Sequence, residues 1–146
     1  MTAEVQASLR KLASLSHNLN EASDRLTAEL NSVETAINKL KLGVGAWVEI
    51  RSEDTGDGFT RICSLGYSKS KGKWGLVLYE CLDGMDEDGE LTPLRDASRD
   101  LRIEAAEKLN ALMEKLAKEA AETTEKVTKQ AAETRKIASA LSNGRT

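Results

Sequence analysis

The sequence is poor in the residues on which most catalytic, metal-binding and membrane-spanning sites depend. It contains one histidine, two cysteines and one proline, and its apolar runs are far shorter than the about 20 residues that cross a bilayer. His17 falls on the solvent side of a predicted helix, far in sequence from Cys63 and Cys81, which lack CxxC spacing. The N-terminal residues include no apolar block typical of a signal peptide. We therefore expect a cytoplasmic, non-enzymatic protein without a metal, cofactor or membrane segment.

The chain also lacks a basic segment. Its net charge at pH 7 is −3, and its thirds are balanced or acidic: 0 for residues 1–42, −4 for residues 43–95 and +1 for residues 96–146. General nucleic-acid binders usually concentrate Lys and Arg on one face or in one tail. Nucleic acid is therefore an unfavoured partner.

Aromatic residues and glycine are absent from most of the chain and concentrated in its middle. All five aromatic residues and nine of the ten glycines lie between positions 43 and 89, whereas the flanks are rich in Ala, Leu, Glu and Lys. Such compositions favour helices in the flanks and strands between them. We predict a single α+β domain with an N-terminal coiled-coil helix (1–42), a β-meander module (43–95) and a C-terminal coiled-coil helix (96–146).

Both flanks carry a heptad repeat of apolar residues. Nine of eleven core positions are apolar from Val5 to Leu40, and eight of eleven from Ala106 to Leu141. Spacing of this kind is typical of a coiled-coil seam, and so long a helix needs a partner for its apolar stripe. The sequence therefore predicts a long antiparallel helical hairpin with a small three-stranded antiparallel β-sheet inserted between the two helices.

The predicted hairpin has a specific register, in which the numbers of two facing residues add up to 146. Apolar positions then face apolar positions, and polar positions face polar ones. The facing pairs include Val5–Leu141, Leu9–Ile137, Leu19–Val127, Leu30–Leu116, Ser16–Gln130 and Ser23–Thr123. Only Leu12 with Thr134 is mixed. Matched polar layers disfavour slipped alignments, although small polar residues are also simply tolerated in such seams.

The middle segment predicts three strands and allows two alternatives for the residues that precede the second helix. The strands are expected at 43–51, 59–70 and 73–81, with a two-residue turn at 71–72. Residues 91–94 either add an edge strand or start the helix, with Thr92 or Asp96 as its cap. A sheet of this size is marginal alone, so it should pack on the hairpin root near Leu40, Leu42, Leu101 and Ile103.

Lysine is concentrated at the turn between the second and third strands. Our candidate interaction surface consists of Lys69, Lys71, Lys73 and Trp74. Residues 71–79 resemble the RNP1 motif of RNA-recognition domains, with Lys73 as an extra residue and Leu76 where an aromatic residue would stack. One extra residue moves the following side chains to the other face of a strand. A solvated lysine turn is the expectation, and an RNA-contacting hairpin is an alternative.

Two further patterns have chemical alternatives that we do not favour. Two acidic loops share part of the EF-hand spacing, but Ser64 and Arg95 occupy the positions of their bidentate glutamates. Cys63 and Cys81 lie on neighbouring predicted strands, either opposite one another or one residue out of step. We expect two inert thiols, and a redox pair is the alternative.

The apolar stripe of each predicted helix is wider than a two-helix seam requires. The flanking positions form our candidate oligomer interface: Leu15, Ala22, Leu112, Ala117, Ala131 and Ala138. A second hairpin alongside would bury them in a four-helix bundle, so we expect a homo-oligomer, with a dimer favoured. Alternatively, alanine is a good helix former that faces water at little cost.

The plan of two long helices joined through a small β element resembles the prefoldin architecture. The resemblance covers the whole chain, without a shared motif, and implies helix tips that hold unfolded clients; here Val5, Leu9, Ile137 and Leu141 would form them. Our functional hypothesis is a non-enzymatic protein–protein interaction or assembly module with an unknown protein partner, oligomerising through its helical hairpin. A prefoldin-like holdase is the alternative.

Overall fold

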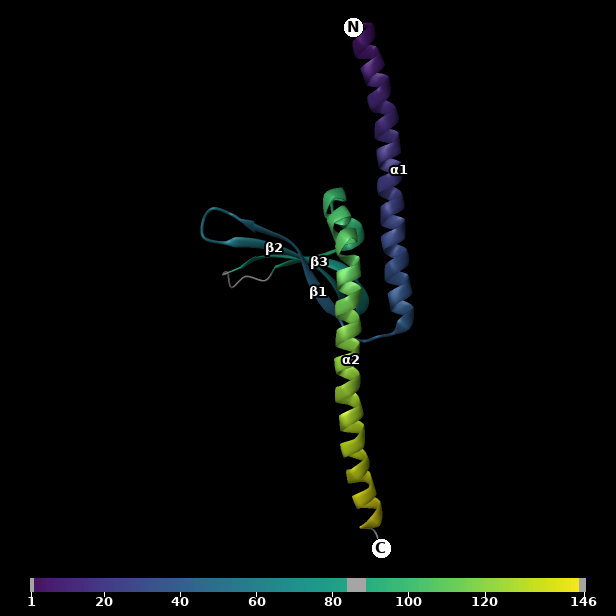
Figure 1. The fold of residues 1–146 in the computed structure, drawn as a ribbon, viewed down its shortest axis with the longest axis vertical. Helices are drawn as coiled ribbons and strands as arrows, with labels where there is room; N and C mark the ends of the chain where they lie inside the picture. The colour runs from purple at the N-terminus through teal and green to yellow at the C-terminus, as the bar shows by residue number, and fades with distance from the viewer. Residues whose placement is uncertain (1, 84–88, 145–146) are drawn as a thin grey trace.

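The computed structural model describes residues 2–83 and 89–144, which form an α+β fold with a four-stranded antiparallel sheet between two helices (Figure 1). The elements are α1 (Ala3–Leu40), β1 (Ala46–Asp54), β2 (Thr60–Ser70), β3 (Lys73–Asp83), β4 (Glu90–Pro93), the 3₁₀ helix η1 (Leu94–Asp96) and α2 (Arg99–Asn143). None of the helices in the described part of the chain combines the length and hydropathy of a membrane span.

The sheet is a meander whose strand order follows the sequence, from β1 to β4. Its central hairpin has the predicted two-residue turn: Ser70 pairs with Lys73, and Lys71 and Gly72 have φ values of 52° and 82°. Two positive φ values are typical of the type I′ turn, which matches the twist of the strands. The expected three strands are corrected to four, because Glu90–Pro93 pairs with β3 as an edge strand.

The start of α2 also differs from both proposed caps. Residues 91–94 contribute to the edge strand and η1, and the helix begins only at Arg99. Its N-cap is Ser98, whose Oγ accepts a hydrogen bond from the Leu101 amide at 3.3 Å. Such a cap satisfies one of the amides that has no partner in the first helical turn.

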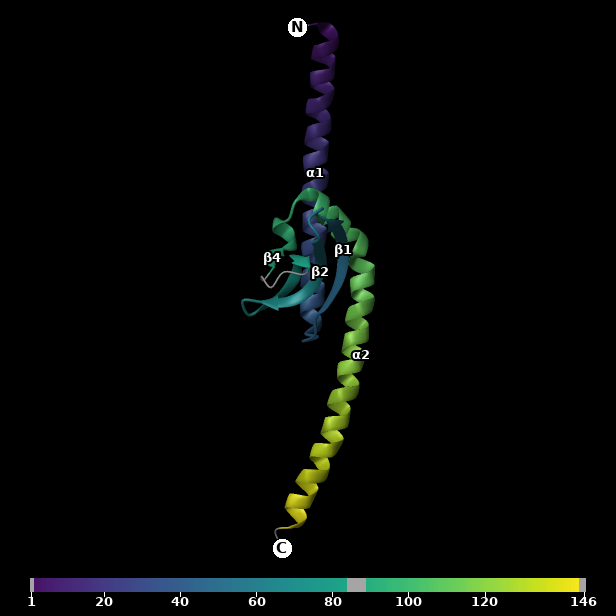
Figure 2. The same ribbon diagram turned by 90° about the vertical axis from the view of Figure 1, so that its left-hand side faces the viewer.

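The two helices do not form the antiparallel hairpin. Both run in the same direction, so that the N- and C-termini lie at opposite ends of the molecule, and they lie side by side only over the second half of α1 and the first half of α2 (Figures 1 and 2). The Arg102 guanidinium donates to the carbonyl oxygen of Ser23 at 3.2 Å and to its hydroxyl at 3.0 Å. The predicted register placed Thr123 at Ser23, and it is wrong within one chain.

The reason lies in how the sheet is covered. η1 packs against both α1 and β3, so α2 starts beside the middle of α1 rather than beside its end. The inner halves of the two helices then cover the sheet, α2 against β1 and β2, and α1 against β3. Burial of the sheet face therefore takes up the apolar residues that the hairpin would have paired with one another.

The core sits where the inner halves of both helices meet the sheet. Its largest fully buried side chains are Leu65, Leu78, Leu94 and Leu112. Leu42 and Leu101 pack against this core as expected, whereas Leu40 and Ile103 are 67% and 43% exposed. The sheet thus packs against the helices near the predicted root, but only some of the predicted contacts form.

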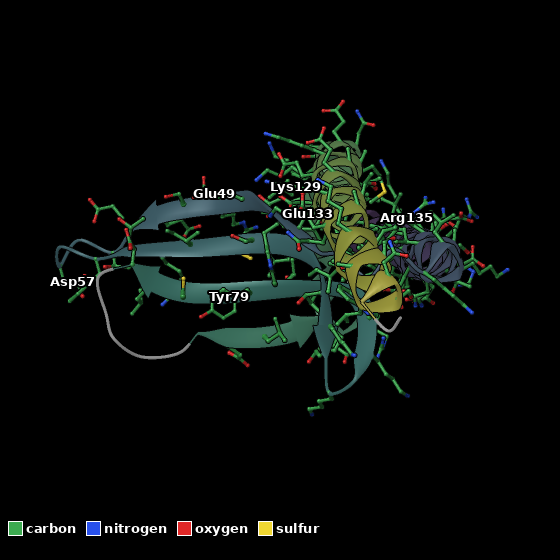
Figure 3. The ribbon with its side chains drawn as sticks, turned by 90° about the horizontal axis from the view of Figure 1, so that it is seen from below. Glu49, Asp57, Tyr79, Lys129, Glu133 and Arg135 are labelled. Carbon is green, nitrogen blue, oxygen red and sulfur yellow. The ribbon has the colours of Figure 1, made fainter. Side chains whose placement is uncertain are left out.

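The outer halves of both helices extend away from this core. Every residue in 3–22 of α1 and in 124–143 of α2 is exposed, and we call these segments the N-arm and the C-arm. Each arm has 20 residues and is about 30 Å long at 1.5 Å per residue. Figure 3 looks along the molecule from the C-terminal end and shows Lys129, Glu133 and Arg135 of the C-arm, with the sheet projecting to one side of the helices.

Candidate functional site

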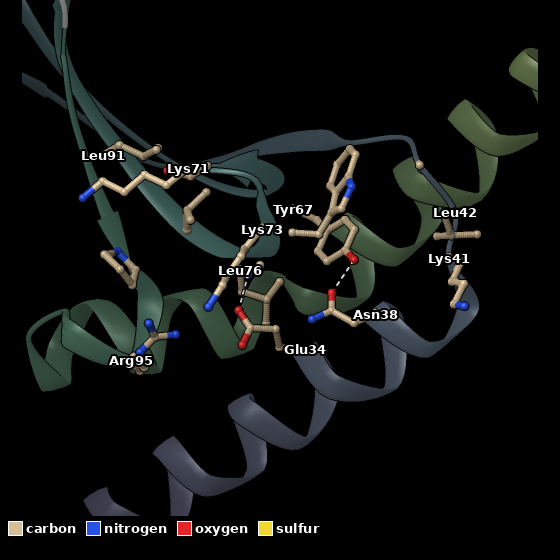
Figure 4. A pocket seen from close by; sticks show the side chains of 16 residues that line it. Glu34, Asn38, Lys41, Leu42, Tyr67, Lys71, Lys73, Leu76, Leu91 and Arg95 are labelled. Carbon is tan, nitrogen blue, oxygen red and sulfur yellow. Dashed lines mark hydrogen bonds between the residues drawn. The ribbon is translucent and has the colours of Figure 1, made fainter.

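A groove of about 880 Å³ lies between the end of α1, the β2–β3 turn and η1 (Figure 4). Three of the four residues proposed as an interaction surface line it: Lys71, Lys73 and Trp74. Lys69 pairs with Trp74 across the hairpin but does not line the groove.

The groove has a strong excess of positive charge. Lys41, Lys71, Lys73 and Arg95 line it, whereas Glu34 is the only acid among its described lining residues. Figure 4 shows Lys71, Lys73 and Arg95 toward the turn and η1, with Lys41 at the opposite end. A concave surface with one sign of charge attracts ligands of the opposite sign, so this groove favours an anionic group.

Glu34 is engaged in a structural contact. Its Oε1 accepts a hydrogen bond from the Leu76 amide of β3 at 2.7 Å. Gly75 lies directly beneath the same carboxylate, and a Cβ at that position would be 2.5 Å from Oε1. Glu34 therefore ties α1 to the strand, and its single negative charge offsets only part of the positive charge that lines the groove.

An aromatic pair forms one wall of the groove. The rings of Tyr67 and Trp74 are stacked, with centroids 5.3 Å apart and an interplanar angle of 18°. The Tyr67 hydroxyl donates to Oδ1 of Asn38 at 2.5 Å, and burial together with the nearby Glu34 charge raises the pKa of Tyr67, which keeps it protonated. Trp74 shares the buried face of β3 with Leu76 and stacks on Tyr67, so it does not form the exposed stacking platform of an RNP1 motif.

The groove also contains an open strand edge. β4 pairs with β3 only over Val77–Glu80, and no described strand pairs with Lys73–Leu76 on that side. Main-chain groups of an open edge are available to an added strand. The Leu76 amide on this edge is already bound to Glu34, so only a short stretch of main chain beside the cations remains without a partner strand.

The sequence interpretation missed the charged and amide side chains that α1, its C-cap and η1 bring to the groove: Glu34, Asn38, Lys41 and Arg95. They come from the end of α1 and from η1, which are far from the β2–β3 turn in sequence. In the heptad pattern of α1, Glu34 and Asn38 are ordinary polar positions outside the seam. No local sequence signal distinguishes them from other solvated side chains.

A second aromatic pair lies on another part of the sheet. Trp47 and Tyr79 meet edge to face, with ring centroids 6.1 Å apart, beside a cavity of about 450 Å³ that Ser64, Ser68 and Leu91 also line. Trp47 covers Gly66 so closely that a Cβ there would be 2.3 Å from the indole. The pair therefore packs on β2 through a position that requires glycine.

The candidate oligomer interface is divided between the arms and the core. Leu15, Ala22, Ala131 and Ala138 lie on the arms, and Ala117 is exposed just before the C-arm. Leu112 is fully buried against the sheet and is not accessible to a partner. The heptad pattern groups Leu112 with the exposed residues because it does not reveal which face of α2 the sheet covers.

The two cysteines do not form a pair. Cys63 faces Glu80 and Cys81 faces Ile62, so they are one residue out of step, and both thiols are free. Burial raises the pKa of Cys63 to about 11, which disfavours its reactive thiolate. A disulfide would require a register slip of the central hairpin, so the redox alternative is not supported.

The acidic loops provide no metal site in the described residues, where no group of three His, Cys, Asp or Glu side chains could hold an ion. In the first loop, Asp57 accepts a hydrogen bond from the Phe59 amide and contacts the Thr55 hydroxyl. These bonds lower the pKa of Asp57. Residues 84–88 of the second acidic loop lie outside the described residues.

Comparison with protein-family models, curated proteins and solved structures found no match to this chain.

Proposed function

We propose that this protein is a non-enzymatic interaction and assembly module, whose arms join it to another helical chain and whose groove receives an acidic segment of a partner protein. The observation that carries the proposal is the exposure of the apolar heptad positions on both arms. The antiparallel hairpin within one chain is no longer part of the hypothesis.

The arms expose eight large apolar side chains: Val5 (47%), Leu9 (49%), Leu12 (62%), Leu15 (52%), Leu19 (48%), Val127 (62%), Ile137 (62%) and Leu141 (67%). Contiguous exposed apolar surface on this scale usually marks an interaction site. In proteins, most of the stability of a helix comes from the packing of its apolar face rather than from helix propensity. A partner that covers the stripes would stabilise both arms.

The apolar surface on the arms is large enough to drive association. Full burial of a Leu, Ile or Val side chain contributes about 1.5–3 kcal/mol, so burial of the exposed half contributes about 1 kcal/mol. Two copies carry sixteen such side chains, which gives about 16 kcal/mol in total. This slightly exceeds the about 4–15 kcal/mol that association costs.

The groove supports recognition of an acidic peptide. The Leu76 amide is bound to Glu34, so an extended segment beside residues 73–76 of β3 would gain only a few main-chain hydrogen bonds, a short form of the binding mode known as β-augmentation. Carboxylates along that segment would face Lys71, Lys73, Arg95 and Lys41. Complementary charge of this kind chiefly gives specificity and a fast association rate.

The assembly proposal is tested by the mass of the protein in solution, measured by light scattering during size exclusion. We expect at least twice the 15.9 kDa of one chain. Leu19→Asp should lower this mass, because it places a carboxylate in the apolar stripe, whereas the neighbouring Asn18→Asp should not. A monomeric wild type, or an unchanged mass for Leu19→Asp, would contradict the proposal.

The groove is tested with a fluorescein-labelled peptide of alternating Glu and Val, titrated by fluorescence anisotropy. Lys71→Glu and Lys73→Glu should weaken binding. Lys69→Glu is the matched control, since Lys69 is on the same hairpin but outside the groove. An equal effect of all three would indicate non-specific charge attraction. Binding of an oligouridine probe in preference to the peptide would favour the RNA-contacting alternative.

The prefoldin-like alternative is less well supported. In that architecture the two helix tips of a subunit hold a client together, but here the N-arm and C-arm point away from the sheet at opposite ends of the molecule (Figure 1). Suppression of the aggregation of thermally unfolding citrate synthase by the wild type, and its loss in Leu9→Asp, would be needed to revive it.

A further inference from the structure

We infer that the partner of both arms is a second copy of this chain, so that the N-arm of each copy pairs antiparallel with the C-arm of the other around a twofold axis. This inference rests on the proposed assembly function and names the partner and the register.

The directions of the helices select this arrangement. α1 and α2 run the same way, and their arms extend from opposite ends of the core (Figures 1 and 2). A twofold axis perpendicular to the helices turns the second copy end for end. Its C-arm then lies beside the first N-arm and runs antiparallel to it, and symmetry produces the same contact at the other end.

The lengths of the arms agree with the register read from the sequence. Ser23 is the first residue of α1 that is not fully exposed, and Thr123 is the last such residue of α2. The numbers of these two residues add up to 146, as do those of the outer ends of the arms, at residues 3 and 143. The heptad pattern itself continues inward to Leu40 and Ala106, and in its register the two segments that the structure leaves exposed lie opposite one another.

Four of the five facing layers between two copies are chemically matched. Between arms, the register sets three apolar pairs, one polar pair and one mixed pair: Val5–Leu141, Leu9–Ile137, Leu19–Val127, Ser16–Gln130 and Leu12–Thr134. A shifted register would place the Gln130 amide against leucine, which costs stability. The register that fails within one chain is therefore satisfied between two.

Charge disfavours the pairing of two C-arms. Residues 124–143 carry four basic and two acidic side chains, a net charge of +2, whereas residues 3–22 carry two of each. Two C-arms side by side would bring like net charges together, whereas an N-arm beside a C-arm does not. Like charges close to one another destabilise an interface.

The interface area also favours two seams. An arm about 30 Å long and about 10 Å across presents a face of about 300 Å². One seam therefore buries about 600 Å² in total, which is below the range of specific interfaces, and two seams bury about 1,200 Å², which is at its lower limit. Pairing of two N-arms would form one seam only and would leave both C-arms uncovered.

Disulfide trapping tests the register. In a full-length Cys63→Ala, Cys81→Ala background, one preparation carries Ser16→Cys and a second, with a mass tag, carries Gln130→Cys. After mixing and mild oxidation we expect a covalent heterodimer whose mass is the sum of one untagged and one tagged chain. Neither preparation should crosslink alone. Asn18→Cys is the control for Ser16→Cys, because residue 18 lies outside the seam and should not crosslink to residue 130.

The outcomes separate this inference from the proposal on which it rests. If the wild type is a monomer by light scattering, both fail. If it is a dimer in which Ser16→Cys crosslinks with itself, the N-arms pair with one another and only the inference is overturned. A dimer with no Ser16–Gln130 crosslink also overturns it. Crosslinking of the mixture with the control silent supports it.

Discussion

The sharpest test of this structure compares the same substitution at two leucines that the sequence does not distinguish. Leu15 and Leu112 occupy equivalent flanking positions of their heptads. In the structure Leu112 is fully buried against the sheet, whereas Leu15 is 52% exposed on the N-arm. Leu112→Ala should therefore destabilise the fold, and Leu15→Ala should affect only assembly.

The two substitutions should affect different quantities: Leu112→Ala the free energy of unfolding, and Leu15→Ala the affinity of the dimer. Truncation of a fully buried leucine removes its transfer free energy and leaves a cavity, a cost of about 2–5 kcal/mol. For a cooperative unit of this size, about 3 kcal/mol lowers the Tm by about 10 °C. Leu15→Ala removes about 1 kcal/mol at each of two seams, which weakens the dimer by about 30-fold.

Two measurements decide the matter. Urea unfolding monitored by tryptophan fluorescence reports the core, because Trp47 and Trp74 both lie in the sheet. Sedimentation equilibrium reports the dimer dissociation constant. If Leu112→Ala changes the free energy of unfolding by less than about 1 kcal/mol, its placement in the core is wrong. If Leu15→Ala leaves the dissociation constant unchanged, the N-arm is not an interface.

Three other predictions concern the core and the groove. Glu34→Ala should cost about 2 kcal/mol of unfolding free energy, because the buried Leu76 amide loses its charged acceptor, whereas Glu34→Gln should cost less; equal stability of both variants in urea would contradict that role. Gly66→Ala should destabilise the sheet by about 1–3 kcal/mol and shift the emission of Trp47, whose ring must move; an unchanged spectrum and stability would count against the packing of Trp47 on this strand. Folding raises the pKa of Cys63 from its ordinary value to about 11, so the folded state holds the proton more tightly than the unfolded state does. The free energy of unfolding should therefore fall as pH rises from about 9 to 11. Cys63→Ala should lose this pH dependence, and parallel plots of unfolding free energy against pH for the two proteins would contradict the prediction.

Much of the local structure follows from the residues themselves. The flanks are helical because they are rich in good helix formers and contain neither proline nor aromatic residues, and the middle is stranded because it holds the aromatic residues and turn glycines. Gly72 can adopt a positive φ at no steric cost, which fixed the turn of the central hairpin. The fourth strand was foreseen only as an alternative, since the pairing of residues 90–93 depends on a neighbour rather than on their own composition.

The candidate site was only partly predictable. Lys71, Lys73 and Trp74 could be singled out because they cluster at one turn, and the structure places them in the groove. Glu34 and Arg95 could not, because they come from separate elements and have no unusual local pattern. Their position depends on where η1 and the end of α1 meet the sheet.

The residues of this chain specify which segments are helices and strands, and which faces of the helices are apolar. What covers those faces depends on how the whole fold packs. A heptad repeat indicates that an apolar stripe must be buried. Burial of a leucine side chain, however, contributes the same free energy against a sheet as against another helix. Leu112 and the inner halves of α1 and α2 pack against the sheet, and in this packing α2 runs parallel to α1. The stripes on the two arms remained exposed, and the register read from the sequence describes how a second chain would cover them.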